Sequence, residues 1–470
     1  MSTSTTHKIK SFFRLFREAV KGGDHDYTQT PIDRAIFLLA IPMILEMAME
    51  SVFAVVDVYF VSLLHNNDAV ATIGLTESML TIVYSLAMGV GMGATALVAR
   101  RVGEKDLQSA KTAAGQAIIT GIALSAAITF VGVFFAEDLL RLMGASEQLI
   151  ESNAGYARVM LSGNITIVML FAINGIFRGA GDASIAMRSL WIANLINIVL
   201  DPIFIFGWGA FPAYGVEGAA IATNIGRGIG VLYQLYHLFK GDGKIAIRLP
   251  DLRVQREVIR KLVAVSAGGT GQFLIGSASW IFLVRIMSDF GSAALAGYTI
   301  AVRVIIFALL PAWGMANASA TLVGQNLGAG SAERAEQSVW RAAFFNMIFM
   351  AIVTVLFFSL ADPILGLFTT DTEALSNGIL CLKIVSLGYI LYSYGMVVTQ
   401  SFNGAGDTRT PTVISFIGFW LIQIPLAYML AKWFETGPVG VYIAVSLAES
   451  LMAVAGILLF RQGKWKAVKV

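Results

Sequence analysis

Hydrophobic positions in this 470-residue chain gather into long stretches that are separated by short polar segments. A helix that crosses a lipid bilayer needs roughly 20 mostly apolar residues. Stretches of that length lie near residues 34–62, 70–99, 111–136, 154–178, 186–208, 216–239, 258–286, 294–325, 336–360, 375–402, 411–432 and 439–460. The pattern therefore predicts an all-α polytopic membrane protein with twelve transmembrane helices.

The two halves of the chain carry related sequences. Residues 177–182 read Phe-Arg-Gly-Ala-Gly-Asp and residues 402–407 read Phe-Asn-Gly-Ala-Gly-Asp, an offset of 225 positions (402 minus 177) that also places Gly103 on Gly328. A constant register over this distance indicates a tandem duplication. Six spans per half is an even number, so both halves run in the same direction. We therefore expect two six-helix lobes related by a pseudo-two-fold axis along the membrane normal, as in some secondary transporters.

The composition narrows the class of protein further. Hydrophobic residues make up 57% of the chain and charged residues 13%, whereas a soluble domain carries about 25% charged residues. Most of the surface must therefore face the lipid bilayer. The net charge of +3 gives no indication of nucleic-acid binding, and the single cysteine, Cys381, excludes an intrachain disulfide and a cysteine-only metal site.

Lysine and arginine concentrate in the segments on one side of the predicted bilayer. Short cytoplasmic segments are enriched in these residues, so we expect both termini in the cytoplasm, with a bacterial inner membrane as the default location. The expected organisation is a cytoplasmic amphipathic N-terminal segment (1–33), an N-terminal lobe (34–239), a cytoplasmic linker (240–257), a C-terminal lobe (258–460) and a basic cytoplasmic tail (461–470).

Three carboxylates interrupt the first predicted span. Glu46, Glu50 and Asp57 fall within roughly 40° of one another on a helix with 100° per residue. An ionisable group at membrane depth costs about 2.5–3.5 kcal/mol on insertion scales, which makes each a functional candidate. We expect this face to line a wet cavity, although Glu46 and Glu50 can instead pair with a cation elsewhere. Pro42, one turn before Glu46, removes a backbone hydrogen bond and permits a kink.

The fifth span adds Asn194, Asn197 and Asp201 on one side of its helix. Asp57 and Asp201 lie at nearly the same height, and Thr223 and Asn174 can reach them in the outer half of the N-terminal lobe. Carboxylates, amides and a hydroxyl form a hard oxygen cage suited to Na⁺, and the same carboxylates can carry a proton. The simpler alternative is that the asparagines join helices by hydrogen bonds.

The C-terminal lobe differs in its charged residues. Position 282, which matches Asp57 across the duplication, is Phe, and the predicted spans of this lobe carry Arg285 and Arg303. We expect Arg285 to pair with Asp289 one turn later. The interpretation is that the N-terminal lobe holds acidic groups and the C-terminal lobe does not.

These residues together resemble the multidrug and toxic compound extrusion (MATE) transporters. The resemblance covers about residues 34–460 and rests on the two Gly-Ala-Gly-Asp turns, on Val56-Asp57 and on Asn197-x-x-x-Asp201-Pro202. It implies two lobes in a V shape and alternating access. It also implies export of cationic or amphipathic compounds against an inward flow of Na⁺ or H⁺.

The resemblance also implies residue roles. The family's N-lobe cation site maps onto Asp57, Asn197, Asp201 and Thr223 with the carbonyl of Ala219, while Asn174 matches an adjoining polar network and Pro42 the kink proline. Some branches place a glutamate in the seventh span. This chain has none in the middle of that span, which favours the branch that works from the N-lobe.

The mechanism that follows is antiport by competition. Charged, empty Asp57 and Asp201 attract a cationic substrate. Entry of Na⁺ or a proton from outside then neutralises them, allows the first helix to bend at Pro42 and releases the substrate. We expect a monomer with no cofactor besides the coupling ion.

Two other functions remain as alternatives. A flippase for lipid-linked saccharides should hold diphosphate with cations such as Arg285 and Arg303, but the carboxylates of the first span argue against it. An intramembrane enzyme should show a catalytic constellation, and none is present in the sequence. A phosphate-binding Gly-x-x-x-x-Gly-Lys-Ser/Thr loop is also missing, so we expect no ATP hydrolysis.

Overall fold

The computed structural model describes residues 13–64, 67–209, 211–240 and 243–470, and this part of the chain is mainly helical with no strand. The helices of the first half are α2 (Ile32–Ser62), α3 (Asn67–Gly103), α4 (Leu107–Leu142), α5 (Glu147–Ser162), α6 (Ile165–Ala180), α7 (Ala183–Phe206) and α8 (Val216–Lys240). Residues 13–21 are also helical, whereas residues 1–12 of the predicted amphipathic segment lie outside the described residues.

The second half repeats this order. Its helices are α9 (Arg256–Ser288), α10 (Ser292–Gly328), α11 (Ala332–Leu365), α12 (Thr372–Ser386), α13 (Tyr389–Ala405), α14 (Arg409–Phe416), η2 (Ile417–Gln423), α15 (Ile424–Tyr428), η3 (Met429–Trp433) and α16 (Pro438–Arg461). The four elements from α14 to η3 follow one another directly as one helical span. The short helices η1 (Leu249–Leu252) and η4 (Lys464–Ala467) follow α8 and α16.

The observed helices correspond to the twelve predicted spans. In the described part of the chain, 10 helices are long and apolar enough to cross a membrane, and α12 with α13 forms an eleventh span that is bent by 60°. The remaining predicted span is α8, whose apolar character is interrupted by Glu217, Arg227 and His237. The polar residues of α8 thus explain why composition alone detects it less readily.

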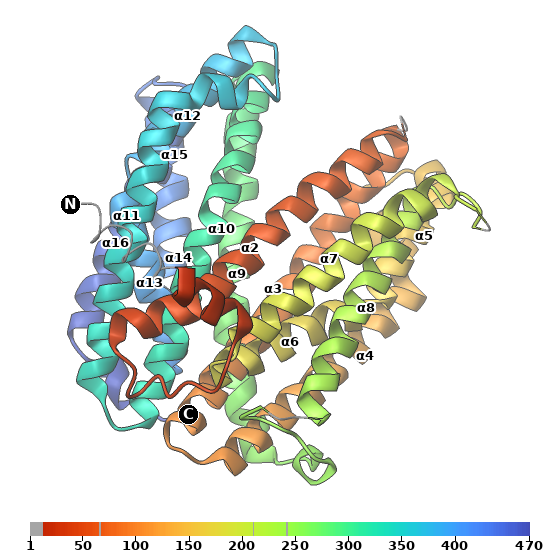
Figure 1. Ribbon diagram of the computed structural model, residues 1–470. Coiled ribbons are helices and arrows are strands. Elements are labelled where there is room, and N and C mark those ends of the chain that lie inside the picture. Colours follow the sequence, from red (N-terminus) through yellow and green to blue (C-terminus); the bar gives the residue numbers. More distant parts are fainter. Residues whose placement is uncertain (1–12, 65–66, 210, 241–242) are drawn as a thin grey trace.

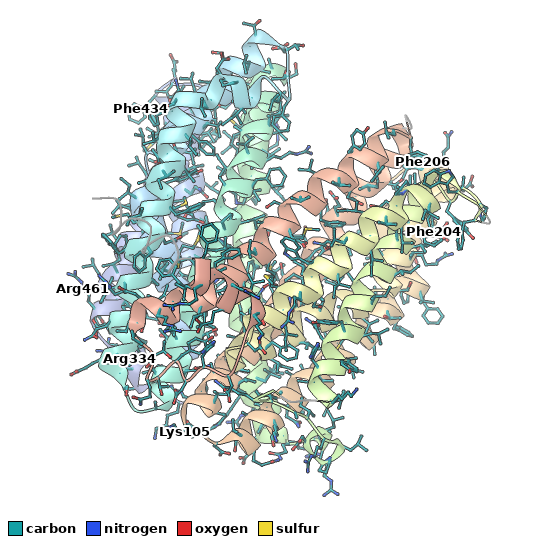
Figure 2. All side chains as sticks on the ribbon, in the orientation of Figure 1. Lys105, Phe204, Phe206, Arg334, Phe434 and Arg461 are labelled. Carbon is teal, nitrogen blue, oxygen red and sulfur yellow. The ribbon has the colours of Figure 1, made fainter. Side chains whose placement is uncertain are left out.

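The helices form two lobes that lie together at one end and diverge toward the other (Figure 1). The first lobe contains α3 to α8, the second contains α10 to α16, and α2 and α9 run between them. Lys105 and Arg334 lie near the end where the lobes meet, whereas Phe204, Phe206 and Phe434 lie toward the tips (Figure 2). We call the first end, with Arg100, Arg101, Lys105 and Arg334, the basic end, and the other the splayed end.

Equivalent backbone geometry in the two halves supports the duplication. Gly181 ends α6 with φ 91° and Gly406 ends α13 with φ 88°, a left-handed conformation that favours glycine. The residue after each glycine donates its N–H to the carbonyl five residues earlier, at 2.9 Å in both lobes. This is the hydrogen-bond pattern of a Schellman cap. The repeated Gly-Ala-Gly-Asp sequence therefore encodes a helix end in each lobe.

The first helix of each half packs across the boundary between the lobes. The early part of α2, including Ile36 and Met43, is buried in the core of the C-terminal lobe. Leu262 and Val265 of α9 are buried in the core of the N-terminal lobe in the same way. Pro42 therefore lies inside α2 near the point where this continuous helix passes from one lobe to the other.

Two glycines allow α3 and α10 to touch at the basic end. A Cβ added at Gly103 would lie 2.0 Å from the carbonyl oxygen of Gln325, and one added at Gly328 would lie 2.1 Å from that of Arg100. Each contact is the repeat of the other, because Gly103 and Arg100 match Gly328 and Gln325 at the 225-residue offset (328 minus 103 and 325 minus 100). The pseudo-two-fold axis thus passes through this closely packed crossing, which brings the two lobes into backbone contact.

Candidate functional site

The N-terminal lobe brings most of the predicted ion ligands together. In the amide orientation that satisfies its neighbours, Asn197 donates to Asp201 Oδ2 at 3.0 Å and accepts from the backbone N–H of Thr223 at 2.9 Å. Asp201 and Asn197 are buried, at 0% and 2% exposure. Asp57 is half-buried, and its charge is close enough to repel that of Asp201. The Asp201 carboxylate, the Asn197 amide and Thr223 therefore meet between α7 and α8, and Asp57 of α2 lies within electrostatic range of them.

Ala219 lies one turn before Thr223 on α8. Its side chain is buried with Val61 and Ile205, which places it between the same three helices as the predicted ion ligands. Among the described residues, no hydrogen bond links the Ala219 carbonyl to the other predicted ligands besides Thr223 of its own helix, so its role as an ion ligand stays a prediction. Thr223 itself is buried, at 7% exposure. Ala219 and Thr223 therefore lie on the part of α8 that packs between α2 and α7.

Asn194 belongs to a neighbouring contact on the same helix face. Its amide donates to Glu50 Oε2 at 3.2 Å and so joins α7 to α2. Glu50 remains half-buried and also interacts with the charge of Arg227. Glu50 therefore lies within electrostatic range of a cation on α8, but no salt bridge joins the two among the described residues, and its pairing with a cation stays a prediction.

Arg227 is a component of this site that the sequence interpretation missed. It is 6% exposed, its guanidinium lies 5.4 Å from the ring centre of Tyr84 and 5.8 Å from that of Phe53, and its Nη1 has no partner among the described residues. Its charge also interacts with that of Asp57. An arginine within an apolar stretch was a visible signal in the sequence, because such a residue is expected to face the interior of the bundle.

Glu46 and Asn174 form a second polar network closer to the basic end. Glu46 Oε1 accepts a hydrogen bond from Arg178 at 2.5 Å and one from Asn174 at 2.9 Å, while Asn174 also accepts from Gln234. Glu46 is only 1% exposed. Glu46 is thus the buried partner of Arg178 and does not line an open cavity as expected. Asn174 belongs to this network, in agreement with its predicted place in a polar network beside the ion site, but the expectation that it meets Asp57 and Asp201 is wrong.

The charged residues of the C-terminal lobe agree only in part with the prediction. The predicted pair is confirmed, since Arg285 donates to Asp289 at 2.9 Å, and Lys432 reaches the same carboxylate at 3.0 Å. The Lys432 hydrogen bond, together with Arg285, holds the pKa of Asp289 below its usual range. The expectation of a lobe without an interior acid is wrong, because Glu449 of α16 faces a cavity inside it.

A cavity between the lobes lies above the crossing of α3 and α10. It is lined by residues of α2, α3 and α6 on one side and of α9, α10 and α13 on the other. Methionine, aromatic and amide side chains dominate this lining, and Arg178 is its charged member. The lining includes Met47, Met88, Met92, Phe171, Phe273, Trp313, Asn317, Gln400 and Asn403. Flexible methionines and aromatic rings adapt to ligands of different shape.

Two repeated six-helix lobes around a shared cavity define a polytopic membrane protein with an architecture that is found in transporters. The sequence profile of the MatE family matches residues 42–203 and 271–429, which is more than half of the chain. The chain therefore belongs to the MatE family, and the predicted family and twelve-helix fold are confirmed.

Known multidrug resistance proteins and MATE structures are similar to this chain over nearly its whole length. The probable multidrug resistance protein NorM of Thermotoga maritima is 27% identical over 443 residues, covering 93% of each chain. A crystal structure of a MATE protein in complex with MaL6 superposes with a TM-score of 0.89 at 28% identity, covering 94% of this chain and 99% of the other. A multidrug resistance MATE family transporter of the MOP superfamily in an outward-facing conformation gives 0.88 at 28% identity, with 94% and 98% covered.

Proposed function

We propose that this protein is a secondary multidrug antiporter that exports cationic or amphipathic organic compounds in exchange for Na⁺ or H⁺. The convergence of Asp57, Asn197, Asp201 and Thr223 in one lobe is the observation that carries the proposal. Its similarity to multidrug resistance proteins supports the substrate class. The protein acts as a transporter and not as an enzyme, and it needs no cofactor besides the coupling ion.

The proposed orientation places the basic end in the cytoplasm, with both termini on that side. Cytoplasmic loops of membrane proteins carry an excess of Lys and Arg, and Arg100, Arg101, Lys105 and Arg334 lie at this end. The lobes then diverge toward the outside of the cell (Figure 1). This arrangement corresponds to an outward-facing state of a monomer in the bacterial inner membrane.

The coupling ion acts at the N-lobe carboxylates. If Glu50, Asp57 and Asp201 are all ionised, Arg227 offsets one of three negative charges and leaves a net charge of −2 (−3 plus +1). This charge attracts either a cationic substrate or the ion. Binding of Na⁺ or a proton lowers the net negative charge and weakens the hold on the substrate. The ion must bind the two states of the transporter with different affinity, since an ion with equal affinity shifts no equilibrium.

The helix α2 transmits this change between the lobes. It contributes Asp57 to the ion site and, before Pro42, is buried in the core of the C-terminal lobe. Proline has no N–H, so the carbonyl of Leu38 lacks its helical partner and the helix bends there at lower cost. Movement of the Asp57 part of α2 is thereby separated from the part that stays with the C-terminal lobe.

Ethidium transport by purified protein in liposomes tests the function. A Na⁺ gradient and a pH gradient are imposed separately, and dye movement is followed by fluorescence. We expect one of the two gradients to drive ethidium against its concentration gradient. Failure of both gradients to drive any of several cationic dyes, with translocation of a lipid-linked saccharide instead, would contradict the proposal.

A further inference from the structure

A second cavity lies entirely within the C-terminal lobe. It is bounded by α9, α10, α13 and α16, with η2 closing one side. Six aromatic side chains line it: Phe273, Trp280, Trp313, Tyr389, Tyr392 and Phe419. Glu449 of α16 is the charged residue of this lining, and the other polar lining groups are neutral hydroxyls and amides. The cavity therefore combines one carboxylate with aromatic walls.

Glu449 lies near the middle of the bilayer. The helix α16 begins at Pro438, eleven residues earlier (449 minus 438). At 1.5 Å per residue this places Glu449 about 16 Å from the helix start, close to the midplane of a hydrocarbon core roughly 30 Å thick. A carboxylate at that depth costs about 2.5–3.5 kcal/mol on insertion scales and marks a functional position by default.

Glu449 has no cationic partner in the part of the chain that the structure describes. The ion pairs made by lysines and arginines of this lobe go to other carboxylates, at Asp33, Asp289 and Glu336. Tyr389 and Tyr392 line the same cavity, and their hydroxyls interact electrostatically with Glu449. The lobe thus contains a half-buried carboxylate at membrane depth that has no cationic partner among the described residues.

The residues that line the cavity indicate which kind of cation can neutralise Glu449. Ring faces carry negative quadrupole density and attract ammonium-type cations within about 6 Å of their centres. A hard inorganic cation instead requires a shell of several oxygen ligands, whereas Glu449 is the single carboxylate in this mainly aromatic and apolar lining. An organic cation with aromatic or alkyl groups matches both the carboxylate and the walls.

The cavity adjoins the space between the lobes. Phe273, Trp313 and Gln400 line both this cavity and the interlobe cavity. The rings of Phe273 and Trp313 pack with their centres 5.5 Å apart at this boundary. Side-chain rotation of this pair is the shortest route by which a molecule between the lobes enters the C-terminal lobe.

We propose that this cavity is a binding site for an organic monocation with aromatic or alkyl substituents, and that Glu449 is its counter-charge. The inference rests on the proposed export of organic cations and adds a place for the substrate. Substrate and coupling ion are then recognised by different carboxylates, Glu449 in one lobe and Asp57 with Asp201 in the other. Competition between them acts through the conformational state as well as through direct displacement.

Equilibrium binding of radiolabelled tetraphenylphosphonium to purified protein tests the counter-charge. We expect Glu449→Gln to weaken binding at least about tenfold, because one partner of a buried charge pair is lost. Glu449→Asp should retain part of the affinity. The matched control is Glu373→Gln, which makes the same change at an exposed position on α12 and should have no effect. Equal affinity of Glu449→Gln and the wild type overturns the proposal.

A labelling experiment locates the ligand without changing Glu449. Ser277 lines the cavity, and the natural Cys381 is buried, which keeps background labelling low. In a Ser277→Cys variant, tetraphenylphosphonium should slow maleimide labelling at concentrations near its Kd. Unchanged labelling at saturating ligand places the cation elsewhere and refutes the inference.

The same two assays separate this inference from the proposed function. Binding and protection that persist in an Asp57→Asn/Asp201→Asn variant support the C-lobe site even if transport is lost. Protection that is reached only at higher ligand concentration also supports the C-lobe site, because the two lobes are coupled through the conformational state. Absence of protection at every ligand concentration, with the protein still monodisperse, contradicts the C-lobe site. Binding with no ion-driven transport by the wild type refutes the antiport proposal alone.

Discussion

The buried ion pair between Glu46 and Arg178 should make a large contribution to stability when only one partner is removed. The side chains of Glu46 and Arg178 are 1% and 14% exposed, and their closest atoms are 2.5 Å apart. In Arg178→Leu, Glu46 keeps only the hydrogen bond from Asn174 at 2.9 Å. Breaking a buried pair in this way costs about 3–5 kcal/mol, because a carboxylate remains buried without its counter-charge.

The double variant Glu46→Leu/Arg178→Leu should be much less destabilised than Arg178→Leu. Replacing both members of a buried pair by apolar residues is often neutral or stabilising, since neither charge then has to be desolvated. The coupling energy in the double-mutant cycle should therefore reach about 3 kcal/mol, whereas independent sites give costs that add to within about 0.5 kcal/mol.

The assay is unfolding of the purified protein in mixed micelles with increasing dodecyl sulfate, followed by tryptophan fluorescence. Arg285→Leu is the matched control, because it breaks an ion pair whose arginine side chain is 75% exposed and should cost less than about 1 kcal/mol. Two results would show that Glu46 and Arg178 are not a buried, coupled pair. Either Arg178→Leu lowers the free energy of unfolding no more than Arg285→Leu does, or the losses caused by Glu46→Leu and Arg178→Leu add up to that of the double variant.

Three further predictions follow from other contacts. Gly103→Leu should separate the lobes at the basic end, because a Cβ at this position would lie 2.0 Å from the Gln325 carbonyl oxygen. Distances between spin labels on the two lobes should lengthen at that end. Unchanged distances would contradict the close backbone contact. Asn197→Ala should raise the half-saturating concentration of the coupling ion about tenfold, since a hydrogen-bonded link to Asp201 is lost, and an unchanged value would remove Asn197 from the site. Thr129→Val and Thr354→Val should each lower the free energy of unfolding by about 1 kcal/mol. The hydroxyl of Thr129 donates to the carbonyl of Ser162 at 2.9 Å, and that of Thr354 donates to the carbonyl of Ser386 at 3.0 Å. Clearly unequal losses in denaturant unfolding would show that the two hydrogen bonds do not stabilise their lobes equally.

The fold could be predicted from the sequence because two independent features, the apolar spans and the internal repeat, indicated the same arrangement. Apolar length determined the spans, and the repeated Gly-Ala-Gly-Asp turns set the register between the halves, which the backbone at Gly181 and Gly406 reproduces. The exchange of α2 and α9 between the lobes could not be predicted in this way. Hydropathy shows that a helix is buried but does not show which neighbour covers each part of it.

The candidate site was only partly predictable for a related reason. Helical periodicity and depth correctly grouped Asn197, Asp201 and Thr223. They did not reveal the partners of Glu46 or Asn174, because residues at similar depth on several helices can face different neighbours. Arg227 and Glu449 were readable as charges within apolar stretches. Their roles were not predictable, because a single charge on a helix does not show which cavity or neighbouring helix it faces.

Ion-driven ethidium transport by Asp57→Asn and Asp201→Asn variants in liposomes tests the central claim most directly. We expect both variants to remain folded but to lose the acceleration that the Na⁺ or pH gradient gives to the wild type. Asp138→Asn serves as a control, because this carboxylate is exposed at the end of α4 and should leave coupling intact. Full gradient-driven transport by both variants would contradict the account.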